Sequence, residues 1–193
     1  MPPQQTIASN VCRLALSGLL LVVACDSSPA GVGGTNLDFL ETLAIVPNPF
    51  GYAPLTAEVT LTADRPVQVE VLVPGRGGPA TDVRRRFGTV TERARLPVLG
   101  LYPNGANTIT LRFFDAGGTF LGDTTHVITT PPLLADLPTV TIDAARPGDM
   151  KPGMNLVGYF GHASQVTPQR PFMFDAAGAI RWYLDFSNHP NLS

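Results

Sequence analysis

A chain of 193 residues with a formal net charge of −2 is long enough for one domain of ordinary size and a smaller second unit. Because acidic and basic side chains nearly balance, the composition implies no global electrostatic partner. Gly and Pro, at 19 residues each, make up about a fifth of the sequence and fall between short apolar runs. Short apolar runs separated by such turn residues are typical of an all-β protein, and no stretch beyond the N-terminus has sustained helical periodicity.

The N-terminus has the features of an export signal. Residues 1–18 contain one basic side chain, Arg13, and an apolar run follows over residues 14–24. That run is shorter than the roughly 20 residues that a membrane-spanning helix needs, so it is typical of a signal-peptide core. It ends in the sequence LVVAC at residues 21–25, which resembles a bacterial lipobox. We therefore predict a lipoprotein signal peptide at residues 1–24 and lipidation of Cys25; the alternative is an ordinary export signal with an incidental cysteine.

Residues 25–39 are predicted to be a flexible tether, because they begin with small and polar side chains. Cys12 would leave with the signal and Cys25 would carry the lipid, so the mature chain would have no disulfide. Its stability must then come from a buried core. The expected location is the bacterial cell envelope, on the periplasmic or outer side, with a membrane as partner through the lipid anchor.

Period-two alternation of apolar and polar side chains dominates residues 40–130. We expect seven strands, over residues 43–46, 55–62, 67–73, 86–90, 92–98, 107–114 and 119–130. The break at residues 64–66 predicts that the second and third strands are antiparallel neighbours. Seven short strands with turn signals between them predict an immunoglobulin-like β-sandwich that folds by itself, although the Cys…Trp…Cys pattern of antibody domains is absent.

Arginine is concentrated in one part of this region. Seven of the twelve arginines lie between Arg65 and Arg95, including a run at residues 84–86. No series of aromatic side chains accompanies them, so we interpret them as a solvated, charged strand edge and expect no nucleic-acid partner.

A proline-rich linker is predicted at residues 131–150, because proline fixes φ and removes backbone donors. Short strands are expected at residues 139–142 and 155–160, followed by a hairpin over 172–185. About four short strands have the size of one propeller blade, and a single blade leaves its faces and edges unpaired. We therefore predict that residues 151–193 are the first strands of an incomplete β-propeller. These strands would form a partial β-propeller blade, and the chain would be the front part of a longer protein or a truncated product of one.

Three motifs carry a resemblance to a known family. The sequences VPNPFGYAPLTA at residues 46–57 and GLYPNGANTITL at residues 100–111 resemble the N-terminal domain of bacterial aryl-sulfate sulfotransferases. FDAAGAIRWY at residues 174–183 is similar to their first propeller blade. The resemblance implies a β-sandwich joined to a six-bladed propeller, commonly as an exported homodimer without a cofactor.

The same resemblance implies sulfuryl transfer from a phenolic sulfate to a phenol, through a histidine that is transiently sulfated. The catalytic blades would lie outside this chain, which would then act as scaffold and dimerisation part. Alternatively, the chain is a non-enzymatic surface lipoprotein whose immunoglobulin-like domain binds a partner.

The catalytic residues are unknown from the sequence, and His162 and His189 are weak candidates only. His162 follows a glycine-containing strand end and His189 follows the predicted hairpin, where most histidines have structural roles. His126 is expected to face solvent from an alternating strand. No two histidines have metal-ligand spacing and no nucleotide fingerprint occurs, so we expect neither a metal nor a cofactor. Tyr102, beside an Asn-Gly turn, is expected to be structural; the alternative is a contact with the propeller or a second subunit.

Overall fold

The structure is a computed structural model that describes residues 36–143, 153–159 and 170–187. The predicted signal peptide, Cys25, most of the tether, His162 and His189 lie outside the described residues.

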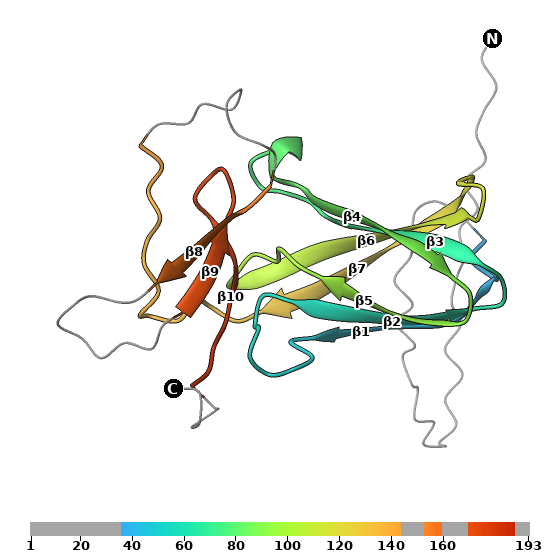
Figure 1. The fold of residues 1–193 in the computed structure, drawn as a ribbon, viewed down its shortest axis with the longest axis horizontal. Coiled ribbons are helices and arrows are strands. Elements are labelled where there is room, and N and C mark those ends of the chain that lie inside the picture. The colour runs from blue at the N-terminus through green and yellow to red at the C-terminus, as the bar shows by residue number, and fades with distance from the viewer. Residues whose placement is uncertain (1–35, 144–152, 160–169, 188–193) are drawn as a thin grey trace, which may run out of the picture. The chain divides into compact units, whose positions relative to one another are not determined.

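Seven strands form two antiparallel sheets that pack against each other (Figure 1). The first sheet has the order β1-β2-β5, with bounds Leu40–Pro47, Ala57–Ala63 and Arg93–Val98. The second sheet has the order β4-β3-β6-β7, with bounds Val83–Val90, Val67–Val73, Gly105–Asp115 and Phe120–Thr130. The prediction of an all-β fold with an N-terminal sandwich is confirmed.

The core follows directly from the period-two pattern. Alternate side chains of β2 and β3 are buried, such as Leu61 and Val69, and alternate side chains of β6, such as Leu111 and Phe113, meet them between the sheets. All four are fully buried, so the burial of apolar surface stabilises the pairing of the two sheets.

The predicted pairing of β2 with β3 is wrong. β2 lies between β1 and β5, whereas β3 lies between β4 and β6 in the other sheet. The segment at residues 64–66 therefore crosses from one sheet to the other. Alternation is the same for a hairpin and for a crossing between sheets, so the pattern alone does not distinguish them.

The arginine run lies on β4, which is an edge strand as expected. Glu70 of the neighbouring β3 lies between two guanidinium groups, with Oε1 at 3.1 Å from Nη1 of both Arg84 and Arg112. The guanidinium of Arg86 lies 3.8 Å from the centre of the Phe114 ring. Charged side chains on an edge strand disfavour pairing with the edge of another molecule.

The C-terminal sheet contains β8 (Asn155–Tyr159), β9 (Arg170–Phe174) and β10 (Ile180–Tyr183), in the order β10-β9-β8. Asp175 closes the β9–β10 turn, because its Oδ1 accepts hydrogen bonds from the backbone of Ala177 and Ala179. Residues 139–142 form no strand, which corrects that prediction. Of these four residues, Val140 packs against the core whereas Thr139, Thr141 and Ile142 are exposed, so the segment lacks both a strand partner and a buried face. Whether the three strands begin a propeller blade stays a prediction.

One short helix is present in the described ranges, the 3-10 turn η1 (Pro79–Thr81). None of the helices there is long and apolar enough to cross a membrane.

Candidate functional site

A fully buried arginine joins the C-terminal sheet to the sandwich. Arg181 lies on β10, and its Nε donates a hydrogen bond of 2.7 Å to the carbonyl oxygen of Gly100. Its Nη1 donates to the carbonyl oxygen of Thr81 at 3.1 Å and to the hydroxyl of Tyr102 at 2.7 Å. The guanidinium also lies 3.6 Å from the centre of the Tyr102 ring. Loops of the sandwich therefore surround this cation.

The charge of Arg181 is balanced by Asp175 on the same hairpin. Nη1 of the arginine lies 2.9 Å from Oδ2 of Asp175, and the two side chains are 0% and 3% exposed. The same carboxylate oxygen accepts a hydrogen bond of 3.2 Å from the Tyr102 hydroxyl. Removal of either charge would leave the other buried without its counter-ion, which is strongly destabilising. We call the contacts among Arg181, Asp175 and Tyr102 the junction.

Asn107 holds Tyr102 in position for the junction. Oδ1 of this buried amide accepts the backbone N–H of Tyr102 at 2.7 Å, and Nδ2 donates to the Tyr102 carbonyl oxygen at 2.9 Å and to Thr130 at 3.1 Å. The structural role expected for Tyr102 is thus confirmed. Its hydroxyl also contacts the β9–β10 hairpin. The alternative interpretation expects a contact with the propeller, and whether this hairpin belongs to a propeller stays a prediction.

A second buried arginine, Arg170 on β9, connects the segment that follows the sandwich to the C-terminal sheet. Its Nε lies 2.9 Å from Asp136 and its Nη1 lies 3.1 Å from Asp185. Asp136 belongs to the predicted linker, so this part of the linker is bound to the C-terminal sheet.

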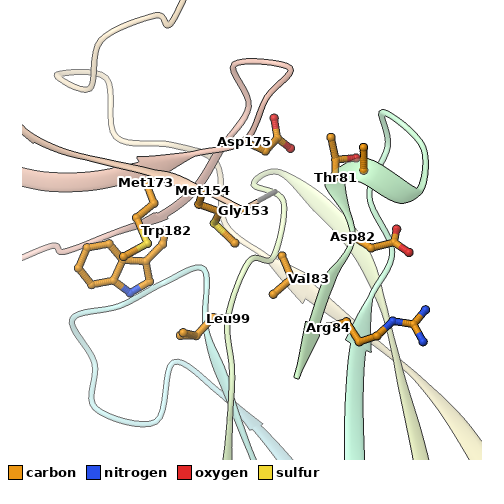
Figure 2. A pocket seen from close by; sticks show the side chains of 11 residues that line it. Thr81, Asp82, Val83, Arg84, Leu99, Gly153, Met154, Met173, Asp175 and Trp182 are labelled. Carbon is orange, nitrogen blue, oxygen red and sulfur yellow. The ribbon is translucent and has the colours of Figure 1, made fainter. Parts of the chain in front are cut away.

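A cleft of about 390 Å³ lies beside the junction (Figure 2). Val83 and Leu99 of the sandwich and Met154, Met173 and Trp182 of the C-terminal residues provide its apolar walls.

The backbone of the sandwich comes close to the C-terminal residues here. Gly100 has φ of +81°, and a Cβ at this position would lie 2.5 Å from Val83 and 2.7 Å from the Met154 methyl group. Only glycine fits both the conformation and the space.

The polar groups of the cleft are already engaged within the protein. Asp82 accepts the backbone N–H of Gly75 at 2.8 Å, and Arg84 pairs with Glu70. None of the described residues that line the cleft is a histidine. The arrangement is suited to apolar packing and to holding two units together, and it contains no nucleophile paired with a base.

His126 lies apart from the junction, on β7 opposite the buried Ile109. The expectation that it faces solvent is wrong, because residues paired across two strands share one face and Ile109 faces the core. Its Nε2 is buried and has no hydrogen-bond partner among the described residues. Burial lowers the pKa of His126 below its ordinary value of 6.5.

This environment predicts a pH-dependent stability. Since the folded state disfavours protonated His126, the unfolded chain binds the proton first, and the free energy of unfolding should fall as the pH decreases through about 6.5. Denaturant titrations at a series of pH values between about 8 and 5 measure this. Glutamine does not titrate, so His126→Gln should reduce the change of the free energy of unfolding with pH. An unchanged pH dependence would show that other groups cause it.

Among the residues that the structure describes, no group of three or more His, Cys, Asp or Glu side chains could hold a metal ion. The roles assigned to Cys25, His162 and His189 stay predictions. The sequence patterns single out neither Arg181 nor Asp175, although one signal is present: an arginine between Ile180 and Trp182, in an apolar strand, needs a buried acceptor.

Comparison with known proteins agrees with this description of the sandwich. Residues 44–131 match the family described as arylsulfotransferase Ig-like domain, a match that covers β2–β7 and the second half of β1. The chain is 31% identical over 122 residues to the arylsulfate sulfotransferase AssT of Lelliottia amnigena, covering 60% of this chain and 19% of that protein. The chain thus spans about a fifth of the length of this curated relative. The immunoglobulin-like domain of this chain, at residues 44–131, thus belongs to the arylsulfotransferase Ig-like domain family.

Proposed function

We propose that the chain is the N-terminal portion of an exported arylsulfate sulfotransferase, and that its Ig-like domain is the scaffold on which the first strands of a propeller are fixed. The observation that carries the proposal is the junction: a domain matched to this family holds the β9–β10 hairpin through a buried, charge-balanced arginine. Hydrogen bonds in such a buried, low-dielectric contact are stronger than in water. We therefore expect the contact to hold the hairpin permanently on the domain.

In this proposal the chemistry belongs to residues beyond the described part. Sulfuryl transfer through an imidazole needs a nucleophilic histidine and cationic groups around the sulfuryl oxygens, within about 3 Å of the reacting atoms. His126 lies in the sandwich, apart from the cleft, and both buried arginines are already bound to carboxylates. The donor would be a phenolic sulfate and the acceptor a phenol, and the sandwich would also contribute to a homodimer.

We expect the purified chain by itself to transfer no sulfate. Incubation with 4-nitrophenyl sulfate and phenol, followed through the release of nitrophenolate, measures this. The reason is that no described cluster brings a free histidine and cations to one point. Turnover that disappears in His162→Ala or His189→Ala would contradict the proposal, because the chain would then assemble its own site.

The alternative, a surface lipoprotein with an immunoglobulin-like binding domain, predicts a different gene. Sequencing the DNA that follows the codon of Ser193 distinguishes the two. An open frame that encodes further Asp-x-x-Gly hairpins and histidines supports the enzyme, whereas a stop codon without such sequence downstream supports the binding protein.

The location in the cell envelope is part of the proposal. If Cys25 is acylated, radiolabelled fatty acid should be incorporated into the mature protein and Cys25→Ala should abolish the label. Cys12→Ala is the matched control and should retain it, because that residue lies within the predicted signal peptide. Label that persists in Cys25→Ala would remove the lipid anchor from the proposal.

A further inference from the structure

Three arginines gather on the outer face of the four-stranded sheet. Arg84 and Arg86 lie two positions apart on the edge strand β4, so their side chains leave the same face of the sheet. Arg112 lies on β6, and Glu70 of β3 lies between the two strands, opposite both Arg86 and Arg112. These strands are neighbours in the order β4-β3-β6 (Figure 1). We call Arg84, Arg86 and Arg112 the arginine cluster.

The arginine cluster contains more positive charge than its acidic neighbour balances. Oε1 of Glu70 lies 3.1 Å from Nη1 of both Arg84 and Arg112. Asp123 lies opposite Arg112 on β7, but no ion pair joins these two side chains, and no other described carboxylate pairs with the cluster. Three guanidinium groups therefore share one carboxylate. The side chains of Arg84 and Arg112 are still 48% and 35% exposed, so part of each group can be reached from solvent.

Arg86 has no anionic partner within the part of the chain that the structure describes. Its guanidinium lies over the ring of Phe114, 3.8 Å from the ring centre, and the residue is exposed. A contact with a ring face restrains a guanidinium without using its N–H groups as hydrogen-bond donors. Arg86 is thus held in place by an aromatic ring, and its donors remain available to an anion from outside.

We propose that the arginine cluster binds a phosphate monoester group, with Arg86 as the main contact and Arg84 and Arg112 as further donors. Such a group carries close to two negative charges near neutral pH and presents three acceptor oxygens, so it matches several guanidinium groups at once. A phosphodiester carries less charge and fewer free oxygens, and it fits the cluster less well. The site goes beyond the proposed sulfotransferase role and does not depend on it, since it lies on the sandwich and uses none of the histidines.

The carboxylate of Glu70 gives the proposal a test with a definite sign. Its Oε1 occupies the position between Arg84 and Arg112 that an oxygen of an external anion would take. Glu70→Gln keeps the shape of the side chain and removes its negative charge, so it should strengthen the binding of a phosphate monoester severalfold. A cluster that serves only to charge the strand edge would show no such gain.

Binding is measured by NMR on the full-length chain, through the Nε–H signals of its isotope-labelled arginines. The probe is methyl phosphate at about pH 7.5, where the second proton of the ester is lost. Dimethyl phosphate is the matched diester. The ionic strength is held constant with sodium chloride, because salt screens exposed charges.

We expect methyl phosphate to bind and to shift the Arg86 signal most, and dimethyl phosphate to bind about tenfold more weakly. Arg86→Gln should weaken methyl phosphate at least about tenfold, because charge-assisted hydrogen bonds are lost. The matched control is Arg95→Gln, which makes the same change of charge on β5 of the other sheet. The Arg95 side chain is 65% exposed there, and its replacement should leave binding unchanged.

Three results would overturn the proposal: no binding of methyl phosphate, equal weakening by Arg86→Gln and Arg95→Gln, or weaker binding by folded Glu70→Gln than by the parent chain. Equal weakening would show an adventitious ion only, attracted by the charge of the whole surface. Thermal melts verify that each variant is folded, which Arg86→Gln should be because the residue is exposed.

Discussion

Replacing Arg181 with methionine should lower the free energy of unfolding by about 3–5 kcal/mol. Methionine keeps the length of the side chain and loses the charge. The change leaves the carboxylate of Asp175, 3% exposed, without its counter-ion, and it leaves the carbonyl oxygens of Gly100 and Thr81 without this donor. Both effects act in a buried environment, where an unpaired charge or acceptor is most unfavourable.

Urea titrations followed by far-UV circular dichroism measure this loss. Arg65→Met is the matched control: its ion pair with Asp64 is about half exposed on both sides, so the expected change is below about 1 kcal/mol. Adding Asp175→Asn to Arg181→Met should recover part of the stability, since the buried negative charge is then removed as well. A loss below about 1 kcal/mol for Arg181→Met alone would show that the junction is dispensable for folding.

Replacing Asn107 with alanine should lower the free energy of unfolding by about 2–3 kcal/mol, and it should also weaken the junction. The change removes the partner of the Tyr102 backbone N–H, at 2.7 Å, in a region where Asn107 is 4% exposed. The loop that carries Tyr102 then loses its support, and the tyrosine hydroxyl is no longer held at Arg181.

The matched control is Thr108→Ala on the exposed face of the same strand, with an expected change within about 0.5 kcal/mol. A double-mutant cycle between Asn107→Ala and Arg181→Met tests the connection through Tyr102. We expect a coupling energy above about 0.5 kcal/mol, because both residues act on one hydrogen-bonded group. Strict additivity would mean that the loop and the arginine stabilise the fold independently.

The shared core also bears on the prediction that residues 40–130 fold by themselves. Phe172, Ile180 and Tyr183 of the C-terminal sheet belong to the same buried cluster as the sandwich residues. The sandwich contains most of that cluster, so independent folding stays a prediction, with some loss of apolar burial expected when the C-terminal sheet is absent.

The sequence by itself determined the features that depend on neighbouring residues. Alternation along β2, β3 and β6 specifies strands with one buried face, because successive side chains of a strand point to opposite sides. The Asp-x-x-Gly turn of the β9–β10 hairpin has a local cause too: Gly178 has φ of +81°, and Asp175 binds the turn's own backbone. The arginine run likewise identified β4 as an edge strand.

Only the tertiary structure decided which strands share a sheet and what surrounds each buried polar group. Alternation states that a strand has two unlike faces, and it contains no information on which strand lies beside it. The pattern therefore predicts β2 and β3 in one sheet and His126 on the solvent face, whereas β2 and β3 lie in different sheets and His126, on the edge strand β7, shares the face of the buried Ile109. Asp175 lies six positions before Arg181, but the sandwich partners of this arginine lie 79 to 100 positions earlier in the chain, at separations that no local pattern encodes. Such contacts arise when the two sheets and the hairpin pack as a whole, because only then does the arginine become buried and require its acceptors.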